Sequence, residues 1–400
     1  SVIQEFLPEE FWEVTIELQD KNGKKLIANL HSKLEKRIEK LSIKNKDQAT
    51  DFKNKLLQNN FLVENVIKKD KKRSPYSPFS NSLLLQDASS KLGFSPKYTN
   101  SIAQQLKDGI SDLGALITYH RSDSNKMKQN EIKNLRNIIN KEIGENYLSK
   151  DEIVYKEKSK FVQQGHEAVT PTQLDRMPKD VQNNLDIDQF KLYDLIWKRT
   201  IASQMAQSQN LETTYLFKGG DFSLKSIGSI QIFDGFKKIY NFSDKNDDQQ
   251  SLPNLKKGDS LKIVKVDIKQ HFTKPPNRFS EAGLIKKLEE LGIGRPSTYV
   301  SIFSKLESNS YVTIKNKSLI PSSRGKVLSK FLDGFFLKFV DYQFTANLEE
   351  QLDLITESKK NWKHTLQDFL KLLNSTVNEV QDKSITEVID KINELSPEIL

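Results

Sequence analysis

Residues 278–320 read RFSEAGLIKKLEELGIGRPSTYVSIFSKLESNSYVTIKNKSLI. Ser280 is a typical N-cap for the helix that follows, and Gly292 is a typical stop signal at its end. A tight turn containing Arg295 separates this helix from a second one, and alternating apolar residues around 315–317 predict a short hairpin. Two helices joined by a turn and followed by a basic hairpin indicate a winged-helix unit.

The turn of this unit carries polar groups that suit a phosphate. Arg295, Ser297 and Thr298 lie at the expected N-terminus of the second helix, where free backbone N–H groups and the helix dipole favour an anion. An ordinary helical hairpin with a capped second helix would show the same residues. These residues alone therefore leave phosphate binding and simple capping as alternatives.

Outside this unit the chain alternates between β-rich and helical stretches. Alternating apolar residues from Trp12 to Leu18, followed by Asn22-Gly23, predict a hairpin near the start. Short strands are predicted within 213–266, and helices at 51–57, 80–93, 95–106, 126–143 and 188–206. The order β, α, β, α indicates an α+β chain of several domains that leaves one domain and returns to it.

A basic run marks the first boundary between these stretches. Residues 68–73 read KKDKKR, and residues 74–78 add two prolines. Like charges and prolines together predict an exposed connection. We expect a domain boundary at this point.

Composition excludes several classes of protein. Lys and Arg number 62 against 53 Asp and Glu, a formal net charge of +9 that favours a polyanionic partner. The absence of cysteine excludes disulfides, thiol nucleophiles and Cys-ligated zinc within this chain. No apolar run approaches the roughly 18 residues that span a bilayer, and the first residues lack the pattern of a signal peptide. We expect a soluble, cytoplasmic protein with no membrane partner.

The segment 114–124, GALITYHRSDS, changes from apolar to densely polar within a few residues. Tyr119 and Arg121 are two positions apart, so on an extended backbone they face the same side. A phenol beside a guanidinium is a suitable nucleophile for a phosphodiester, because the guanidinium stabilises phenolate character and binds two phosphoryl oxygens. The alternative is a tyrosine packed in the core with a surface arginine nearby, and this spacing alone favours that alternative.

A second polar segment occupies residues 164–172, QGHEAVTPT. His166 can donate to a phosphate or move a proton, and the adjacent Glu167 can orient it. A solvent-exposed His-Glu pair is the simpler interpretation of this dipeptide taken alone.

Taken together, these segments resemble the bacterial type IA DNA topoisomerase I family. Each of these short segments is common by itself, but chance does not account for their occurrence in this order over nearly the whole chain. The resemblance is carried by residues 11–14, 116–124, 165–168, 192–199, 203–205, 271–276, 292–299, 341–342 and 344–346.

The resemblance implies a reaction and a set of site residues. Tyr119 would attack one DNA strand and form a 5′-phosphotyrosyl link, and Arg121 would stabilise the transition state. Such an ester conserves the energy of the phosphodiester, so cleavage, strand passage and rejoining would relax negative supercoils without ATP. The implied catalytic set is Tyr119, Arg121, Asp123 and His166, and the implied contacts to single-stranded DNA are Arg278, Arg295, Ser297 and Thr298.

The resemblance also implies an α+β multidomain toroid that acts as a monomer. Residues 16–78 and 206–233 would form a β-rich arch. Residues 79–205 would form a helical domain that carries the nucleophile. Residues 1–15 and 234–400 would form a mostly helical, winged-helix-like domain that binds DNA and closes the ring.

Metal binding is expected outside this chain. The family's magnesium-binding (toprim) domain, with its acidic clusters, would precede Phe11, and the family's zinc ribbons would follow the C-terminal end. Neither is found in these 400 residues. We therefore expect no metal site and no zinc here, a dependence on Mg²⁺ held elsewhere in the full enzyme, and poor cleavage by this chain alone.

Several positions depart from the family pattern. His120 stands where the family usually has Met, Ser122 where it has Thr, Gly165 where it has Ala, and Thr170 where it has Arg. The segment 109–113 looks longer than usual. These departures concern the rate and the balance of rejoining more than the class of activity.

Other functions remain to be distinguished. One alternative is a non-catalytic module that binds single-stranded DNA on the same scaffold. A second is a basic protein with a structural or partner-binding role, and a third is a decatenating relative within the same superfamily. Trapping of a covalent adduct at Tyr119 separates the first from an enzyme, and salt-dependent DNA binding tests the second.

Overall fold

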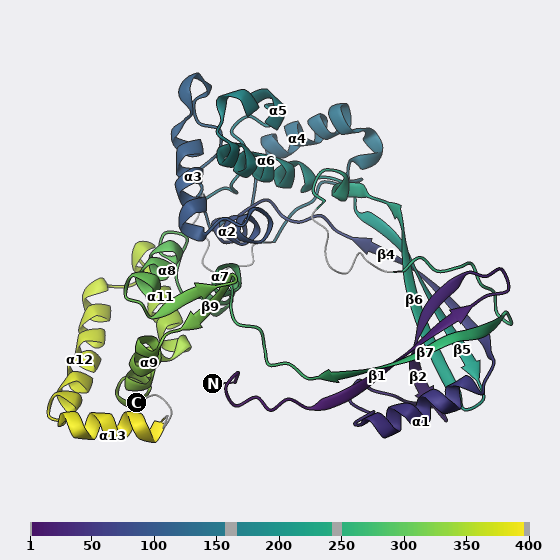
Figure 1. Ribbon diagram of the computed structural model, residues 1–400. Helices are drawn as coiled ribbons and strands as arrows, with labels where there is room; N and C mark the ends of the chain where they lie inside the picture. The colour runs from purple at the N-terminus through teal and green to yellow at the C-terminus, as the bar shows by residue number, and fades with distance from the viewer. Residues whose placement is uncertain (1, 157–165, 242–249, 396–400) are drawn as a thin grey trace. The chain divides into compact units, whose positions relative to one another are not determined.

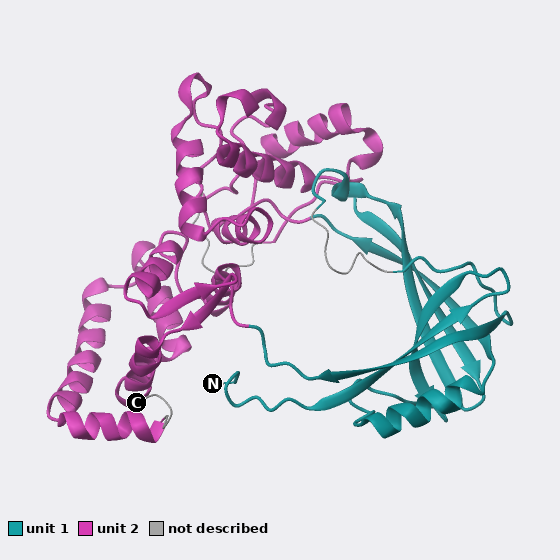
Figure 2. Cartoon of the chain, viewed as in Figure 1, with its two compact units in different colours: residues 1–75, 206–277 teal, residues 76–205, 278–400 magenta. Residues whose placement is uncertain are grey.

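The structure is a computed structural model that describes residues 2–156, 166–241 and 250–395 (Figure 1). The chain divides into two compact units, which we call the sheet unit (residues 1–75 and 206–277) and the helical unit (residues 76–205 and 278–400; Figure 2). Each unit contains two separate stretches of chain, in agreement with the predicted α+β order. Gly165, one of the positions that depart from the family pattern, lies outside the described residues.

The sheet unit contains a seven-stranded antiparallel sheet with the order β1-β7-β4-β5-β6-β2-β3. β1 also pairs with β2, so the pairings close on themselves. Helix α1 (Lys46–Leu57) and a 3₁₀ turn at Gly235–Lys238 accompany the sheet. The strands are β1 (Glu10–Gln19), β2 (Lys25–Lys33), β3 (Lys36–Arg37), β4 (Phe61–Arg73), β5 (Ser208–Gly219), β6 (Phe222–Phe233) and β7 (Ser260–Phe272).

The predicted hairpin at the start of the chain is confirmed as β1 and β2. Gly23 has a φ of +82°, a left-handed conformation that glycine adopts without strain. The Asp20 side chain accepts hydrogen bonds from the backbone N–H groups of Asn22 and Lys24, at 2.9 and 2.8 Å. The Asn-Gly signal therefore fixed the turn through local backbone geometry.

Alternate residues of the strands fill the core of the sheet unit. Val14, Ile16 and Leu18 of β1 are buried, and they belong to one cluster with Phe61 of β4 and Phe217 of β5. The spacing of two follows from the strand pleat, which sends successive side chains to opposite faces. Removal of these apolar side chains from water is the main stabilising contribution to this unit.

β4 continues through the basic run. Lys68 to Arg73 pair residue by residue with β5, and Arg73 lies opposite Ser208. The prediction of a connection at 68–73 is therefore wrong, although the run is exposed, and the boundary between the units lies at residues 75 and 76, within the predicted stretch 68–78. The hydrogen-bonded ladder with β5 outweighs the weak strand preference of lysine.

The structure draws the boundaries differently from the domains that the resemblance implies. Residues 1–15 and 234–277, assigned above to a mostly helical domain, lie in the sheet unit. The reason is that β1 pairs with β7 along its length, from Glu10 opposite Phe272 to Gln19 opposite Lys262. Residues 79–205 and 278–400, assigned above to two helical domains, fall in one compact unit.

The helical unit holds the remaining helices and a small hairpin. Ser280 caps its helix as predicted, and Ser80 and Ser95 cap theirs in the same way, each accepting a hydrogen bond from a backbone N–H in the first turn. The first stretch contains α2 (Asn81–Asp87), α3 (Pro96–Asp108), α4 (Gln129–Ile138), α5 (Pro178–Val181) and α6 (Ile187–Ala202). π-Helical turns at Ala88–Leu92 and Ile139–Ile143 extend α2 and α4, and 3₁₀ turns lie at Ser111–Leu113, Glu145–Tyr147 and Gln182–Asn184.

The second stretch of the helical unit confirms the winged-helix pattern. It begins with α7 (Glu281–Leu291), α8 (Tyr299–Ser308) and the hairpin β8–β9 (Val312–Lys315 and Ser318–Pro321). Ile285, Tyr299, Phe303 and Leu319 form a buried cluster with Leu85 of α2, so this motif packs on the first stretch of the unit. The stretch continues with α9 (Ser323–Phe335), α10 (Leu337–Val340), α11 (Tyr342–Thr356), α12 (Trp362–Gln381) and α13 (Ile385–Leu395).

Among the described residues, no helix combines the length and the apolar character that a bilayer crossing requires.

Candidate active site and nucleic-acid interface

The Tyr119 segment is held at its base by a neighbouring extended segment. Ile117 forms an isolated antiparallel bridge with Pro171, and the Thr118 backbone N–H donates to the Thr170 carbonyl at 2.9 Å. The Thr118 hydroxyl donates to the Ala168 carbonyl at 2.9 Å and accepts from the Thr170 N–H at 3.0 Å. These bonds bring together the two polar segments that the sequence separates by about fifty residues.

The residues that follow alternate between buried and exposed positions. Tyr119 is 50% exposed and Arg121 is exposed, whereas His120, Ser122 and Ser124 are buried. Tyr119 and Arg121 therefore share one solvent-facing side of an extended segment, as their spacing predicted. The interpretation of Tyr119 as a packed core residue is wrong.

The N-terminus of α2 holds the buried side of this segment. The Asn81 backbone N–H donates to the Ser122 carbonyl at 2.7 Å, and the Asn81 Nδ2 donates to the His120 carbonyl at 2.8 Å. Because the main chain is fixed on both sides of Arg121, Tyr119 and Arg121 are presented by a rigid backbone. Among the described residues, the Tyr119 hydroxyl has no hydrogen-bond partner and is free to meet a ligand.

His166 is oriented by Asp123, not by its neighbour in the sequence. The His166 Nδ1 and the Asp123 Oδ1 are 2.9 Å apart, and the two side chains are 32% and 13% exposed. Glu167, the acid that the dipeptide suggests, instead forms an ion pair with Lys128 at 2.5 Å. The structure thus joins His166 to the Tyr119 segment through Asp123.

His120 is a feature that sequence reasoning did not interpret beyond its departure from the family pattern. The side chain is fully buried, and neither ring nitrogen has a hydrogen-bond partner among the described residues. Burial, with a smaller contribution from the positive charge of Arg121, lowers the pKa of His120 to about 4. The ring is therefore neutral at physiological pH.

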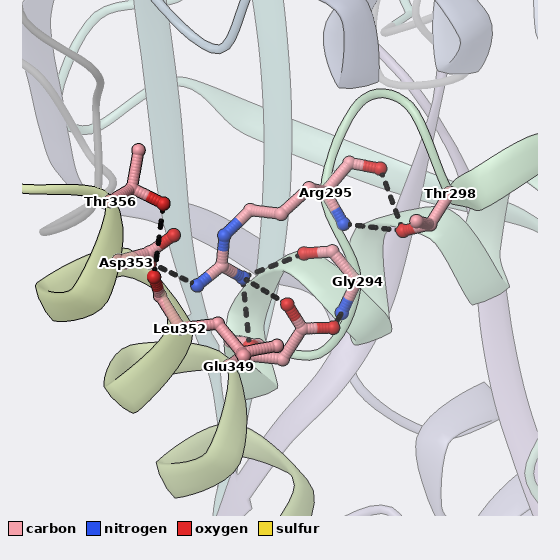
Figure 3. Close-up of polar contacts among 8 residues, drawn as sticks. Gly294, Arg295, Thr298, Glu349, Leu352, Asp353 and Thr356 are labelled. Carbon is pink, nitrogen blue, oxygen red and sulfur yellow. Dashed lines mark hydrogen bonds and ion pairs between the residues drawn. The ribbon is translucent and has the colours of Figure 1, made fainter. Parts of the chain in front are cut away.

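The guanidinium of Arg295 is occupied by other protein groups (Figure 3). Its Nη2 lies 2.5 Å from Asp353 Oδ2, and its Nη1 donates to the Gly294 carbonyl at 2.8 Å and to the Gly292 carbonyl at 3.2 Å. Glu349 on the same helix as Asp353 adds a contact at 3.7 Å and accepts from the Gly294 N–H at 3.2 Å. These donors tie the turn to α11.

The rest of the turn keeps its polar side chains at the surface. Ser297 and Thr298 are exposed, and the Thr298 hydroxyl accepts from the Arg295 N–H at 2.8 Å. Arg278, the remaining predicted DNA contact, is exposed in the segment that precedes α7. Of the predicted DNA-binding set, these three residues remain accessible to a ligand.

A polar groove of about 920 Å³ lies between α3 and α8 in the helical unit. Lys97 and Asn100 of α3 line one wall, and Ser304 and Lys305 of α8 line the other. Arg121 and Ser297 also line this groove, so the structure brings together residues that were predicted from separate segments. Cations, hydroxyls and amides are the side chains that contact a nucleic-acid backbone.

A smaller pocket of about 360 Å³ is also lined by the turn. Asp123, Ser80 and Glu289 line it together with Arg295 and residues of α11. Within the described ranges, no group of three or more His, Asp or Glu side chains is placed to hold a metal ion.

The sequence comparisons with known proteins all find DNA topoisomerases. The family model described as DNA topoisomerase matches residues 1–367. DNA topoisomerase 1 from Rickettsia bellii (strain RML369-C) is 41% identical over 401 residues, which cover 98% of this chain and 50% of the relative. DNA topoisomerase 1 from Campylobacter jejuni is 38% identical over 400 residues, which cover 99% of this chain and 56% of the relative.

The structural comparison agrees with the sequence comparison. Full-length topoisomerase I from Thermotoga maritima superposes with a TM-score of 0.79 at 32% identity, covering 94% of this chain and 60% of that chain. The chain thus spans about half the length of the curated relatives it matches.

Proposed function

The chain belongs to the bacterial type IA DNA topoisomerase family, and we propose that it carries the strand-cleaving nucleophile of such an enzyme. The observation that carries the proposal is the placement of Tyr119. Its hydroxyl is accessible and without a partner among the described residues, and Arg121 lies on the same side of a segment that is fixed by Asn81 and Thr170. Accessibility and rigid presentation are what a nucleophile toward a DNA phosphate requires.

The proposed reaction balances without an external energy source. The Tyr119 oxygen attacks the phosphorus, the bond from phosphorus to the 3′ oxygen breaks, and a 5′-phosphotyrosine and a 3′-hydroxyl result. The phenol gives up one proton and the departing oxygen takes one up, and rejoining reverses both transfers. One ester replaces another, so no ATP is consumed, and passage of the other strand before rejoining relaxes negative supercoils.

Arg121 and the His166–Asp123 pair support this step. Arg121 can donate two hydrogen bonds to phosphoryl oxygens as negative charge builds on them. An ionised Asp123 only accepts, so the proton on His166 Nδ1 is fixed and Nε2 is left for a phosphate oxygen or a transferred proton. The pair is a positioned acid–base unit in the same part of the helical unit.

Single-stranded DNA is the proposed substrate, and the groove between α3 and α8 is its proposed contact. Arg121, Lys97 and Lys305 supply positive charge there, and serine and amide side chains supply neutral donors. We propose that Ser297 and Thr298 contribute to this contact, that Arg295 acts by fixing their turn, and that the protein acts as a monomer on cytoplasmic DNA.

Mg²⁺ is the cofactor that the resemblance implies. The described residues do not fit it, because they place no acidic cluster that could bind a divalent cation. We therefore assign no step in this chain to the metal.

The test is transfer of a labelled DNA end to the protein. A 5′-phosphotyrosine links the protein to the downstream fragment, so a 3′-labelled oligonucleotide should label the denatured full-length polypeptide, and a 5′-labelled one should not. Tyr119→Phe should abolish transfer and leave DNA binding within about twofold. Tyr98→Phe is the matched control, since Tyr98 is 45% exposed in the same unit and should behave as the parent.

Two outcomes would count against the proposal. Transfer by the Tyr119→Phe variant would place the nucleophile elsewhere. Tight binding of single-stranded DNA with no transfer by the parental protein would favour the non-catalytic binding module.

A further inference from the structure

The second half of β4 is a strongly cationic strand. Residues 68–73 contain five cations and one acid, Asp70. All four of the lysines are exposed, although they belong to a paired strand. The ladder with β5 therefore holds the charges in a row, at positions that a flexible connection could not maintain.

Strand geometry sets the spacing of these charges. Lys68 and Lys72 share one face of β4, and Lys69 and Lys71 share the other. Successive residues on the same face are about 6.5–7 Å apart along a strand. Both faces of this part of the strand are open to solvent, so an extended polyanion can approach from either face.

Neighbouring acids neutralise only part of this charge. The Lys71 Nζ lies 3.7 Å from the Glu212 Oε1 on β5, and Glu212 is directly opposite Lys69 in the ladder. Within the part of the chain that the structure describes, Lys68, Lys69 and Lys72 have no ion-pair partner. A positive excess therefore remains exposed on this strand.

Protection of an open strand edge is the competing explanation. Among the described residues, β7 pairs with β4 only near Phe61 and Leu62, so the edge beyond them is not covered by another named strand. Charged side chains on such an edge prevent pairing with other chains. Lysine is favoured for that purpose as well, so the run of five positive charges and one negative charge is compatible with both explanations. The two explanations differ in their consequence, because only a DNA contact makes these lysines contribute to the salt dependence of DNA binding.

We propose that residues 68–73 of β4 bind the phosphate backbone of a DNA segment. This inference rests on the proposed function, which makes DNA the polyanion that the protein meets. The contact is separate from the groove between α3 and α8, because β4 lies in the sheet unit and the groove lies in the helical unit. Lysines contact phosphates without reading bases, so the contact is independent of sequence.

The test is the salt dependence of binding to a single-stranded oligonucleotide. The combined variant Lys68→Glu, Lys69→Glu and Lys72→Glu should have a weaker salt dependence. The magnitude of the negative slope of log affinity against log salt should fall by about 2, since each lost contact to a single strand contributes about 0.7. At 0.1 M salt the affinity should fall by about tenfold to a hundredfold. Arginine at the same three positions should restore the parental slope.

A charge-matched control separates a local contact from a change in net charge. Lys21→Glu, Lys24→Glu and Lys46→Glu change three exposed lysines of the same unit, in the β1–β2 turn and at the start of α1. This variant should keep the parental slope within about 0.5. If the β4 variant weakens binding no more than this control, β4 does not contact DNA and the inference fails.

Glutamine at positions 68, 69 and 72 provides a second variant in case the glutamates disturb folding, and it should lower the slope by the same amount. The parental slope in a folded glutamine variant would also overturn the inference. End-label transfer to Tyr119 is an independent measurement. If the parental protein shows no end-label transfer, the proposed chemistry is wrong. If the β4 variants keep the parental salt slope, only the proposed β4 contact is wrong.

Discussion

The Nδ1 atom of His166 lies 2.9 Å from the Oδ1 atom of Asp123, across 43 positions of sequence. Asp123 belongs to the segment that presents Tyr119, and His166 follows a stretch that is not described. The contact therefore joins the two segments that carry the proposed catalytic residues. Since an ionised carboxylate can only accept, the contact also fixes which ring nitrogen carries the proton.

Asp123→Asn should slow DNA cleavage by about tenfold to a hundredfold, at or below the lower end of the 10²–10⁴ that a positioned acid or base contributes, because the His166 ring itself is kept. An amide can donate to Nδ1 and so stabilise the other tautomer of His166. Single-turnover cleavage across a range of pH measures the effect, and DNA affinity should stay within about twofold. Glu167→Gln is the matched control, because Glu167 pairs with Lys128, and parental behaviour is expected. A larger loss in the Glu167 variant than in the Asp123 variant would contradict the assignment.

Arg121→Ala should reduce the rate of cleavage by about 10²–10³, the effect of removing one donor to the developing charge. Arg121→Lys keeps the charge but loses the bidentate hydrogen-bond donor, so we expect a cleavage rate between that of the parent and that of Arg121→Ala. Single-turnover cleavage at saturating DNA separates this loss from weaker binding. Lys97→Ala changes another cation of the same groove and should affect binding more than the rate. Parental cleavage by Arg121→Ala would show that the arginine has no part in the transition state.

Arg295→Ala should destabilise the helical unit by about 2–3 kcal/mol, because it removes a charged hydrogen bond and leaves Asp353 without its partner. Thermal or denaturant unfolding measures the loss. In a double-mutant cycle, the loss of unfolding free energy in the double variant Arg295→Ala, Asp353→Asn should be smaller than the sum of the losses in the two single variants. If Arg295→Ala unfolds like the parent, and the magnitude of its slope of log DNA affinity against log salt is smaller by about 0.7, the result would instead support the phosphate contact first predicted for Arg295.

His120 should make stability depend on pH. The pKa of His120 falls from 6.5 in the unfolded chain to about 4 in the folded one, mainly through burial, with Arg121 and Lys107 opposing and Asp108 favouring the charged form. As the pH falls, the ring binds a proton in the unfolded chain before it does so in the folded one. The contribution of the neutral His120 ring to the free energy of unfolding is therefore fully present above pH 6.5 and declines as the pH falls toward 4. The expected loss at pH 4 is on the order of 3 kcal/mol, at about 1.4 kcal/mol per pKa unit.

Denaturant unfolding at several pH values checks this prediction. His120→Met has no titrating ring, so its stability should vary less over the same window than that of the parent. Equal pH dependence in the two proteins would show that His120 is not the titrating group responsible.

Local signals in the sequence predicted several of the elements and some of their ends. Ser80, Ser95 and Ser280 fixed helix starts because a cap bonds to a backbone N–H within the same turn. The Asn22-Gly23 turn and the two-residue spacing of Tyr119 and Arg121 are similarly short in range. Backbone geometry within a few residues was sufficient for each of these predictions.

Long-range contacts decided the rest. The sequence alone predicted a loop at 68–73, because nothing in that run indicates that β5, more than a hundred residues later, supplies a ladder partner. It also left phosphate binding and simple capping open for the Arg295 turn, and it gave no sign of the contact with Asp353, which lies 58 positions away.

The order of motifs in the sequence was enough to identify the family and to propose Tyr119 as the nucleophile. Tertiary structure alone selected Asp123 over Glu167 as the partner of His166, and it brought Arg121 and Ser297 to one groove. The physical reason is that caps, turns and periodicity act between near neighbours in the chain. Ion pairs, sheet pairing and grooves depend on which distant segments packing places together.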